Sequence, residues 1–183
     1  MTEIRSAADR TDRLLSICAV VVAVSSVAIA VYQTRIMREQ QKAAVWPHLA
    51  QSNSLPPGEA YTRTVENSGI GPAIVRTFQV RVDGKPQRDW AATVRALTGI
   101  RSDGGLTYSS FDPGTVLLPG TSRTVLTLPA GPVALSFWEQ AQTRLVTRVC
   151  YCSVYGDCWL ADSEGEPEPV RACMPDPAAD FRQ

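Results

Sequence analysis

Histidine is almost absent from this chain, which has 183 residues and a single histidine, His48. A serine or cysteine nucleophile needs a nearby base, and histidine is the usual one. His48 directly follows Trp46 and Pro47 beside an apolar segment, a position that suits an interfacial residue better than a catalytic base. The scarcity of histidine disfavours hydrolase chemistry, and we expect a protein that is not an enzyme and holds no cofactor or metal.

An excess of positive charge is missing as well. The chain carries 18 Lys and Arg against 18 Asp and Glu, so its formal net charge is zero. No long cluster of Lys and Arg interrupts this balance, and no internal repeat is visible. Electrostatic binding to nucleic acid draws on a basic patch, so we expect no nucleic-acid partner.

The most informative feature that is present is an uncharged apolar run over residues 14–32, LLSICAVVVAVSSVAIAVY. As a helix this run spans about 28 Å, close to the thickness of a bilayer's hydrocarbon core. A cleaved signal peptide has a shorter apolar region, of about 7–15 residues, before a small-residue cleavage site. We therefore predict a retained single-pass anchor in the lipid bilayer, with Tyr32 and Trp46 at the membrane interface.

The flanks of this run leave its orientation open. The positive-inside rule counts Lys and Arg, and each flank has three of them. Small residues at spacings of three and four share one face of the helix and permit close self-association. They are Ala19, Ala23, Ser26 and Ala30.

Four cysteines, Cys150, Cys152, Cys158 and Cys173, cluster near the C-terminus and indicate two disulfides in an oxidising compartment. Cys150 and Cys152 share one strand face about 6.6–6.8 Å apart, which is awkward for bonding to each other. A two-residue hairpin loop at residues 156–157 would place Cys158 on the opposite side of the sheet from Cys152. A three-residue loop or a bulge would allow Cys152–Cys158 and leave Cys173 for Cys150. Reduced buried thiols and a poorly spaced zinc site are the alternatives.

A strand pattern follows the anchor. Phe78, Val80 and Val82 alternate with polar residues, which is typical of a strand with one buried face, and Asp89 and Gly99 bracket a helix over 90–97. Residues 133–142 fit a second short helix or an edge segment. We predict a mainly β fold, in which one transmembrane helix precedes an antiparallel immunoglobulin-like β-sandwich with one or two short helices; a small open barrel is the alternative.

Composition divides the chain into five segments. They are a charged tail (1–13), the transmembrane helix (14–32), a juxtamembrane helical stalk (33–47), a β-rich soluble domain (48–161) and an acidic, proline-rich tail expected to be flexible (162–183).

A glycine pair lies between two predicted strands, in the sequence Asn67-Ser68-Gly69-Ile70-Gly71-Pro72. Phosphate-binding glycine loops lead from a strand into a helix, whereas a strand follows here. We therefore interpret Asn67, Gly69, Gly71 and Pro72 as a structural turn, in which the glycines supply positive φ angles and Asn67 bonds local backbone.

Two motifs resemble an uncharacterised family of bacterial single-pass membrane proteins. They are ENSGIGPA at residues 66–73 and CYCSVYGDCW at residues 150–159. The resemblance implies the same architecture, an anchor followed by a β domain, and carries no activity.

Together these observations predict a protein of the bacterial inner membrane whose C-terminal domain lies in the periplasm. We expect a membrane-tethered, non-enzymatic interaction or sensing module, such as an accessory subunit of an envelope complex, that binds a protein partner or associates with itself through the membrane helix. The alternatives are a cytoplasm-facing module of a stress or defence assembly at the membrane, a periplasmic thiol oxidoreductase and an oligomeric channel subunit.

Overall fold

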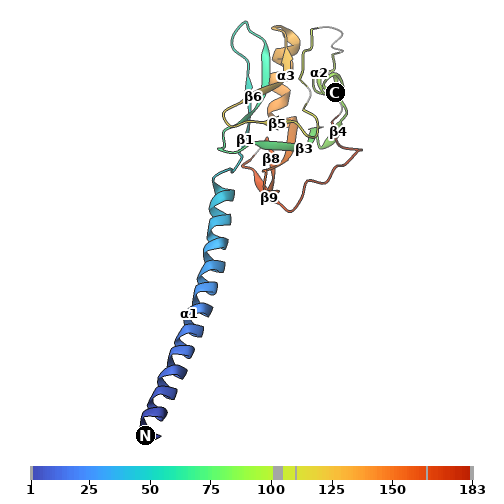
Figure 1. The fold of residues 1–183 in the computed structure, drawn as a ribbon. Coiled ribbons are helices and arrows are strands. Elements are labelled where there is room, and N and C mark those ends of the chain that lie inside the picture. The colour runs from blue at the N-terminus through green and yellow to red at the C-terminus, as the bar shows by residue number, and fades with distance from the viewer. Residues whose placement is uncertain (1, 101–104, 110, 164, 182–183) are drawn as a thin grey trace. The chain divides into compact units, whose positions relative to one another are not determined.

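The computed structural model describes residues 2–100, 105–109, 111–163 and 165–181. The chain forms two units, Met1–Ala43 and Ala44–Gln183, and Figure 1 traces both. Helix α1 (Thr2–Ala43) makes up the first unit. The expected charged tail over 1–13 is therefore part of this helix from Thr2 onward, and Met1 lies outside the described residues.

Helix α1 has the length and composition of a membrane-crossing helix. Its most apolar stretch of 18 residues has a mean hydropathy of 2.7 and is 0% buried within the protein. The hydroxyls of Ser26 and Thr34 donate hydrogen bonds to the carbonyl oxygens four residues earlier, each at 2.8 Å. These polar groups are thus satisfied inside the helix, as a lipid environment requires.

The second unit is an antiparallel β-sandwich, so the predicted fold class is confirmed. One sheet has the order β1-β2-β6 and the other β4-β3-β7-β8-β9, with β5 beside β3. The strands are β1 (Leu49–Ser54), β2 (Tyr61–Asn67), β3 (Ala73–Val82), β4 (Lys85–Gln87), β5 (Val116–Leu117), β6 (Ser122–Leu128), β7 (Leu145–Cys152), β8 (Cys158–Asp162) and β9 (Glu168–Val170).

The alternation in the sequence explains which faces meet in the core. Phe78, Val80 and Val82 of β3 are buried, whereas Gln79 and Arg81 between them are only partly buried. Each fully buried Val or Phe side chain stabilises the fold by about 1.5–3 kcal/mol. The two sheets therefore share one apolar core, and single large-to-small changes in it are expected to be costly.

Two short helices complete the domain. Helix α2 (Trp90–Thr98) begins where the Asp89 carboxylate accepts a hydrogen bond from the Ala92 amide at 2.7 Å, and it ends at Gly99 with a φ of 72°. These are the boundaries that the sequence predicts. Residues 133–142, for which the sequence allowed a short helix or an edge segment, belong to helix α3 (Pro132–Arg144). This helix lies against α2 (Figure 1).

The C-terminal segment 162–183 differs from the flexible tail that we expected. Its strand β9 pairs with β8. The Phe181 amide donates to the Phe78 carbonyl at 2.9 Å, and the Phe181 ring packs against Phe78 and Trp90 at centroid distances of 5.5 and 5.0 Å. Few apolar residues and one cysteine are enough to fix this acidic segment; residues 164, 182 and 183 lie outside the described part.

The register of β1 and β2 defines two ends of the sandwich. Leu49 pairs with Asn67 at one end, and Ser54 pairs with Thr62 at the other. We call the first the junction end, because residues 44–48 enter the domain there from α1. The second, formed by the turn over residues 55–60, is the distal end.

Candidate functional site

The turn at residues 67–72 lies at the junction end and holds the entering chain. The Asn67 side chain is fully buried, and its Nδ2 donates to the carbonyls of Gly71 and Leu117 at 2.8 and 3.0 Å. Its Oδ1 accepts from the amides of His48 and Gly69 at 3.2 and 3.1 Å. One amide side chain therefore joins the entering segment, its own turn and the end of β5, which agrees with the structural role predicted for Asn67.

The two glycines of this turn act through close packing, so the expectation that they supply positive φ angles is wrong. Neither Gly69 nor Gly71 has a positive φ. A Cβ on Gly71 would instead lie 1.8 Å from the Val45 carbonyl oxygen, and one on Gly69 would lie 2.4 Å from the His48 nitrogen. The turn thus fits directly onto the entering backbone, and Pro72 leads from it into β3.

The entering backbone is also hydrogen-bonded to the turn. The amides of Ile70 and Gly71 donate to the Trp46 carbonyl at 3.0 and 3.2 Å. The Trp46 ring lies 5.2 Å from the His48 ring and stays 44% exposed, and Tyr32 on α1 is 66% exposed. Both aromatic side chains are accessible, and their role at a membrane interface stays a prediction.

The four C-terminal cysteines form two adjacent disulfides. Cys150 joins Cys173 with an S–S distance of 2.03 Å, and Cys152 joins Cys158 at 2.11 Å. Cys152 and Cys158 are direct partners across β7 and β8. The loop between them is longer than the two-residue alternative and is closed by the Ser153 amide, which donates to the Asp157 carbonyl at 2.8 Å.

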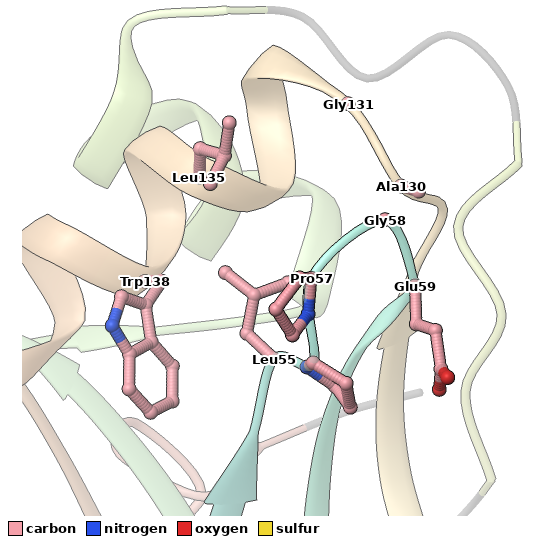
Figure 2. A pocket seen from close by; sticks show the side chains of 9 residues that line it. Leu55, Pro57, Gly58, Glu59, Ala130, Gly131, Leu135 and Trp138 are labelled. Carbon is pink, nitrogen blue, oxygen red and sulfur yellow. The ribbon is translucent and has the colours of Figure 1, made fainter.

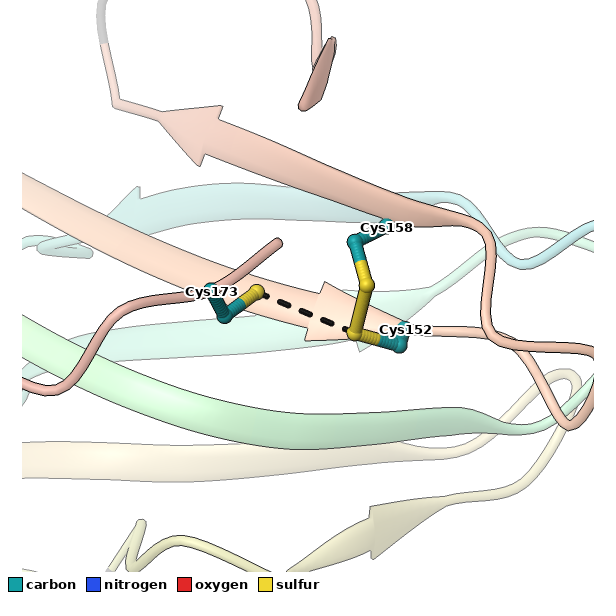
Figure 3. A group of neighbouring side chains, drawn as sticks. All are labelled: Cys152, Cys158 and Cys173. Atoms are coloured by element: carbon teal, nitrogen blue, oxygen red, sulfur yellow. Dashed lines mark hydrogen bonds between the residues drawn. A yellow bond between two sulfur atoms is a disulfide. The ribbon is translucent and has the colours of Figure 1, made fainter. Parts of the chain in front are cut away.

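The two disulfides touch each other. The Sγ atoms of Cys152 and Cys173 are 3.8 Å apart (Figure 3). The sulfurs of Cys152, Cys158 and Cys173 all lie within 4.8 Å of one another. Cys150, Cys152 and Cys158 are buried, whereas Cys173 on the C-terminal segment is only partly so. The remaining cysteine, Cys18, is exposed on α1.

The distal end carries an open apolar cleft of about 420 Å³ between the β1–β2 turn and the start of α3. Figure 2 shows Trp138 on one side, with Leu55 and Pro57 beside it and Leu135 above. Glu59 supplies the acidic group of its rim. The lining residues are Leu55, Pro56, Pro57, Gly58, Glu59, Ala130, Gly131, Leu135 and Trp138. A volume of this size suits one or two large apolar side chains of a ligand.

Local chemistry makes both walls of the cleft rigid. Pro57 and Gly58 occupy the centre of a turn in which the Glu59 amide donates to the Pro56 carbonyl at 3.0 Å and Gly58 has a φ of 77°. Proline followed by a glycine with positive φ is the arrangement of a type II turn. On the other wall Pro132 starts α3, the position at which its missing N–H costs nothing.

A buried aromatic group supports the cleft from below. Tyr61 is fully buried, and its ring lies 5.0 Å from Phe137 and 6.1 Å from Trp138. Burial raises the pKa of Tyr61 above its ordinary value, although the nearby Arg63 guanidinium acts in the opposite direction. The Tyr61 hydroxyl stays protonated at neutral pH and donates to Asn53 Oδ1 at 3.0 Å. Tyr61 therefore supports Trp138, a lining residue of the cleft, from within the core.

Sequence reasoning missed this cleft. The Pro56-Pro57-Gly58 run signals a turn, but only the fold brings residues 130–138 to it. Several of the sequence-predicted site residues lie at the junction end: Trp46 is bonded to the glycine turn, and Cys152 pairs with Ile74 just after that turn. Tyr32 belongs to α1, the other unit. No protein-family model matches this chain, and no curated protein matches its sequence.

Proposed function

We propose that this protein is a membrane-tethered, non-enzymatic interaction module that binds an apolar segment of a protein partner at its distal cleft. The observation that carries the proposal is the exposed apolar lining of that cleft. Leu135 is 57% exposed beside Trp138, Leu55 and Pro57. Exposed apolar patches of this kind on a stable domain are typical of interaction sites.

The tether in this proposal is α1. Its length, its hydropathy and the internally bonded hydroxyls of Ser26 and Thr34 support a helix that crosses a bacterial inner membrane once. The disulfides favour a periplasmic location for the β domain, because such bonds persist in oxidising compartments. The partner is then a protein of the envelope, and the module acts as an accessory subunit or a sensor.

The cleft favours an extended partner segment over a small polar ligand. Both of its walls are apolar, and the hydroxyl of Tyr61 below it is already bonded to Asn53. A rigid apolar cleft loses little conformational entropy when a side chain enters it, which supports binding of an aromatic or branched aliphatic anchor residue.

Site-specific photocrosslinking in intact cells tests the proposal. A photoreactive amino acid at Leu135 is compared with the same residue at Leu118, which is equally exposed at 59% but lies after β5, near the junction end. We expect a discrete protein adduct from Leu135 and none from Leu118. Pro57→Glu, which adds a charge to the cleft, is expected to remove the adduct, whereas Pro57→Ala retains it. Equal adducts from both positions, or an adduct that survives Pro57→Glu, would contradict the proposal.

Thiol labelling tests the location. A membrane-impermeant maleimide is applied to intact cells before and after reduction, in a Cys18→Ser background. A periplasmic domain with intact disulfides is labelled only after reduction. Labelling that appears only after the cells are lysed would place the domain in the cytoplasm and overturn this part of the proposal.

A further inference from the structure

The contact between the two disulfides is a feature that partner binding at the distal cleft does not use. The Cys152 and Cys173 sulfurs are 3.8 Å apart, although they belong to different disulfides. This separation is close to van der Waals contact, and a disulfide requires about 2.05 Å. Exchange requires the Cys173 sulfur to approach Cys152 by less than 2 Å and also to swing into line with the Cys152–Cys158 bond, because the three sulfurs now lie within 4.8 Å of one another.

The exposure of the four cysteines indicates which of the two disulfides an external reductant reaches first. Cys150, Cys152 and Cys158 are 6%, 5% and 8% exposed, so an external reductant meets three protected sulfurs. Cys173 is more exposed and lies on the C-terminal segment, at the surface of the sheet. The Cys150–Cys173 bond is therefore the outer disulfide, and Cys152–Cys158, at the end of the β7–β8 hairpin, is the inner one.

We propose that the four cysteines form a thiol–disulfide relay that takes two electrons from an external dithiol at Cys173 and passes them to the inner disulfide. The external thiolate attacks Cys173 Sγ, and Cys150 leaves as a thiolate and takes up a proton. The second thiol of the reductant then attacks its own sulfur in the mixed disulfide, which releases Cys173 as a thiolate and the reductant as a cyclic disulfide.

The relay step follows inside the protein. The Cys173 thiolate attacks Cys152 Sγ, the Cys152–Cys158 bond breaks, and Cys158 leaves as a thiolate and takes up a proton. The product has a Cys152–Cys173 disulfide and thiols at Cys150 and Cys158, so two electrons have entered in total. Because Cys150 and Cys152 share one face of β7, the C-terminal segment stays tethered to the same sheet.

A matched pair of variants tests the relay in the full-length protein, with Cys18→Ser as the background. Cys150→Ser and Cys173→Ser both remove the outer disulfide and leave one free thiol beside the inner one. After acid quenching, unfolding, alkylation and peptide mapping, we expect Cys150→Ser to carry label on Cys158 as well as on Cys173. Cys173→Ser is expected to carry label on Cys150 alone. Label on Cys173 alone in the first variant, or equal scrambling in both, overturns the proposal.

A second measurement tests the relay in a protein that keeps all four C-terminal cysteines. The Cys18→Ser protein is reduced stepwise with dithiothreitol, and the species that has gained two electrons is trapped and its disulfide mapped. The relay predicts that Cys152–Cys173 is present in that species. A two-electron species that contains only Cys150–Cys173 or Cys152–Cys158 overturns it.

Discussion

The two ends of the β-sandwich are built in opposite ways. At the junction end the side chain of the buried Asn67 makes four hydrogen bonds, and the missing side chain of Gly71 leaves room for the backbone of Val45. At the distal end an apolar cleft stays open, and Leu135 is 57% exposed. The first arrangement fixes the chain that arrives from α1, and the second leaves apolar surface without a partner. The contrast is between a tightly packed, hydrogen-bonded end and an open apolar one, and the second is where we propose that a partner binds.

The largest effect is expected for Gly71→Ala, which breaks the junction end. The new Cβ would meet the Val45 carbonyl oxygen 1.8 Å away, and backbone on both sides prevents relief by a side-chain rotation. We expect a loss of unfolding free energy of about 3 kcal/mol or more, measured by denaturant unfolding of the full chain in detergent. Gly165→Ala is the control, because a Cβ there meets nothing within 4 Å. Equal stability of the two variants would show that the junction is not tightly packed.

Asn67→Asp, also at the junction end, removes the two N–H donors of the Asn67 side chain while preserving the shape of that side chain. A carboxylate has no N–H for the carbonyls of Gly71 and Leu117, which then face a negative charge. We expect a loss of about 2–3 kcal/mol at neutral pH. The loss should shrink in acid, where the carboxyl group regains one donor. A loss that does not depend on pH would argue against this hydrogen-bond account.

The two disulfides close chain loops of different length. The sequence separation is 23 residues for Cys150–Cys173 and 6 residues for Cys152–Cys158. In the chain-entropy description these loops correspond to about 3 and about 2 kcal/mol. Replacing both cysteines of each pair by serine and measuring the unfolding free energy gives the two values. A larger loss from the shorter loop would show that contacts of the hairpin, and not closure of the C-terminal segment, dominate.

A small, pH-dependent effect is expected at the turn between β3 and β4, which contains Asp83. Arg144 Nη2 lies 2.7 Å from Asp83 Oδ2, and this hydrogen bond lowers the pKa of Asp83. A carboxylate whose pKa is lowered by folding stabilises the folded state at any pH above its ordinary, unfolded-state pKa. This stabilisation is lost as the pH falls through the lowered pKa of the folded state. Asp83→Asn, which tolerates the local φ of 50°, should therefore be slightly less stable than the wild type at neutral pH and equal to it in strong acid. Added salt should also reduce the difference.

The smallest effect on stability is expected for Leu135→Asp in the cleft. Because Leu135 is largely exposed near the start of α3, the unfolding free energy should change by no more than about 0.5 kcal/mol. Binding of the partner should nevertheless be lost, as measured by crosslinking from a probe at Leu55. Ala134→Asp, one residue away and fully buried, is the contrasting variant and should be strongly destabilised. A large loss of stability in Leu135→Asp would mean that the cleft is part of the core.

Local signals predicted much of the fold. The alternation around Phe78 predicted β3, and Asp89 with Gly99 predicted the limits of α2, because strand periodicity and helix caps depend on residues close in sequence. Strands β1 and β9 are among those that were not predicted. Their polar and proline-containing sequences, LAQSNS and EPV, have little periodicity, and they form because β2 and β8 offer them a free edge.

The amino-acid sequence by itself determined that α1 is apolar along a membrane-length stretch, that the domain behind it is built from antiparallel strands, and that Asn67 occupies a structural turn. Only the tertiary structure decided why Gly69 and Gly71 are glycines, which cysteines pair and where the cleft lies. The physical reason is distance along the chain. Each of these features depends on segments that are remote in sequence, such as Val45 against Gly71 or Pro57 against Trp138, and the packing of the sandwich alone brings them together.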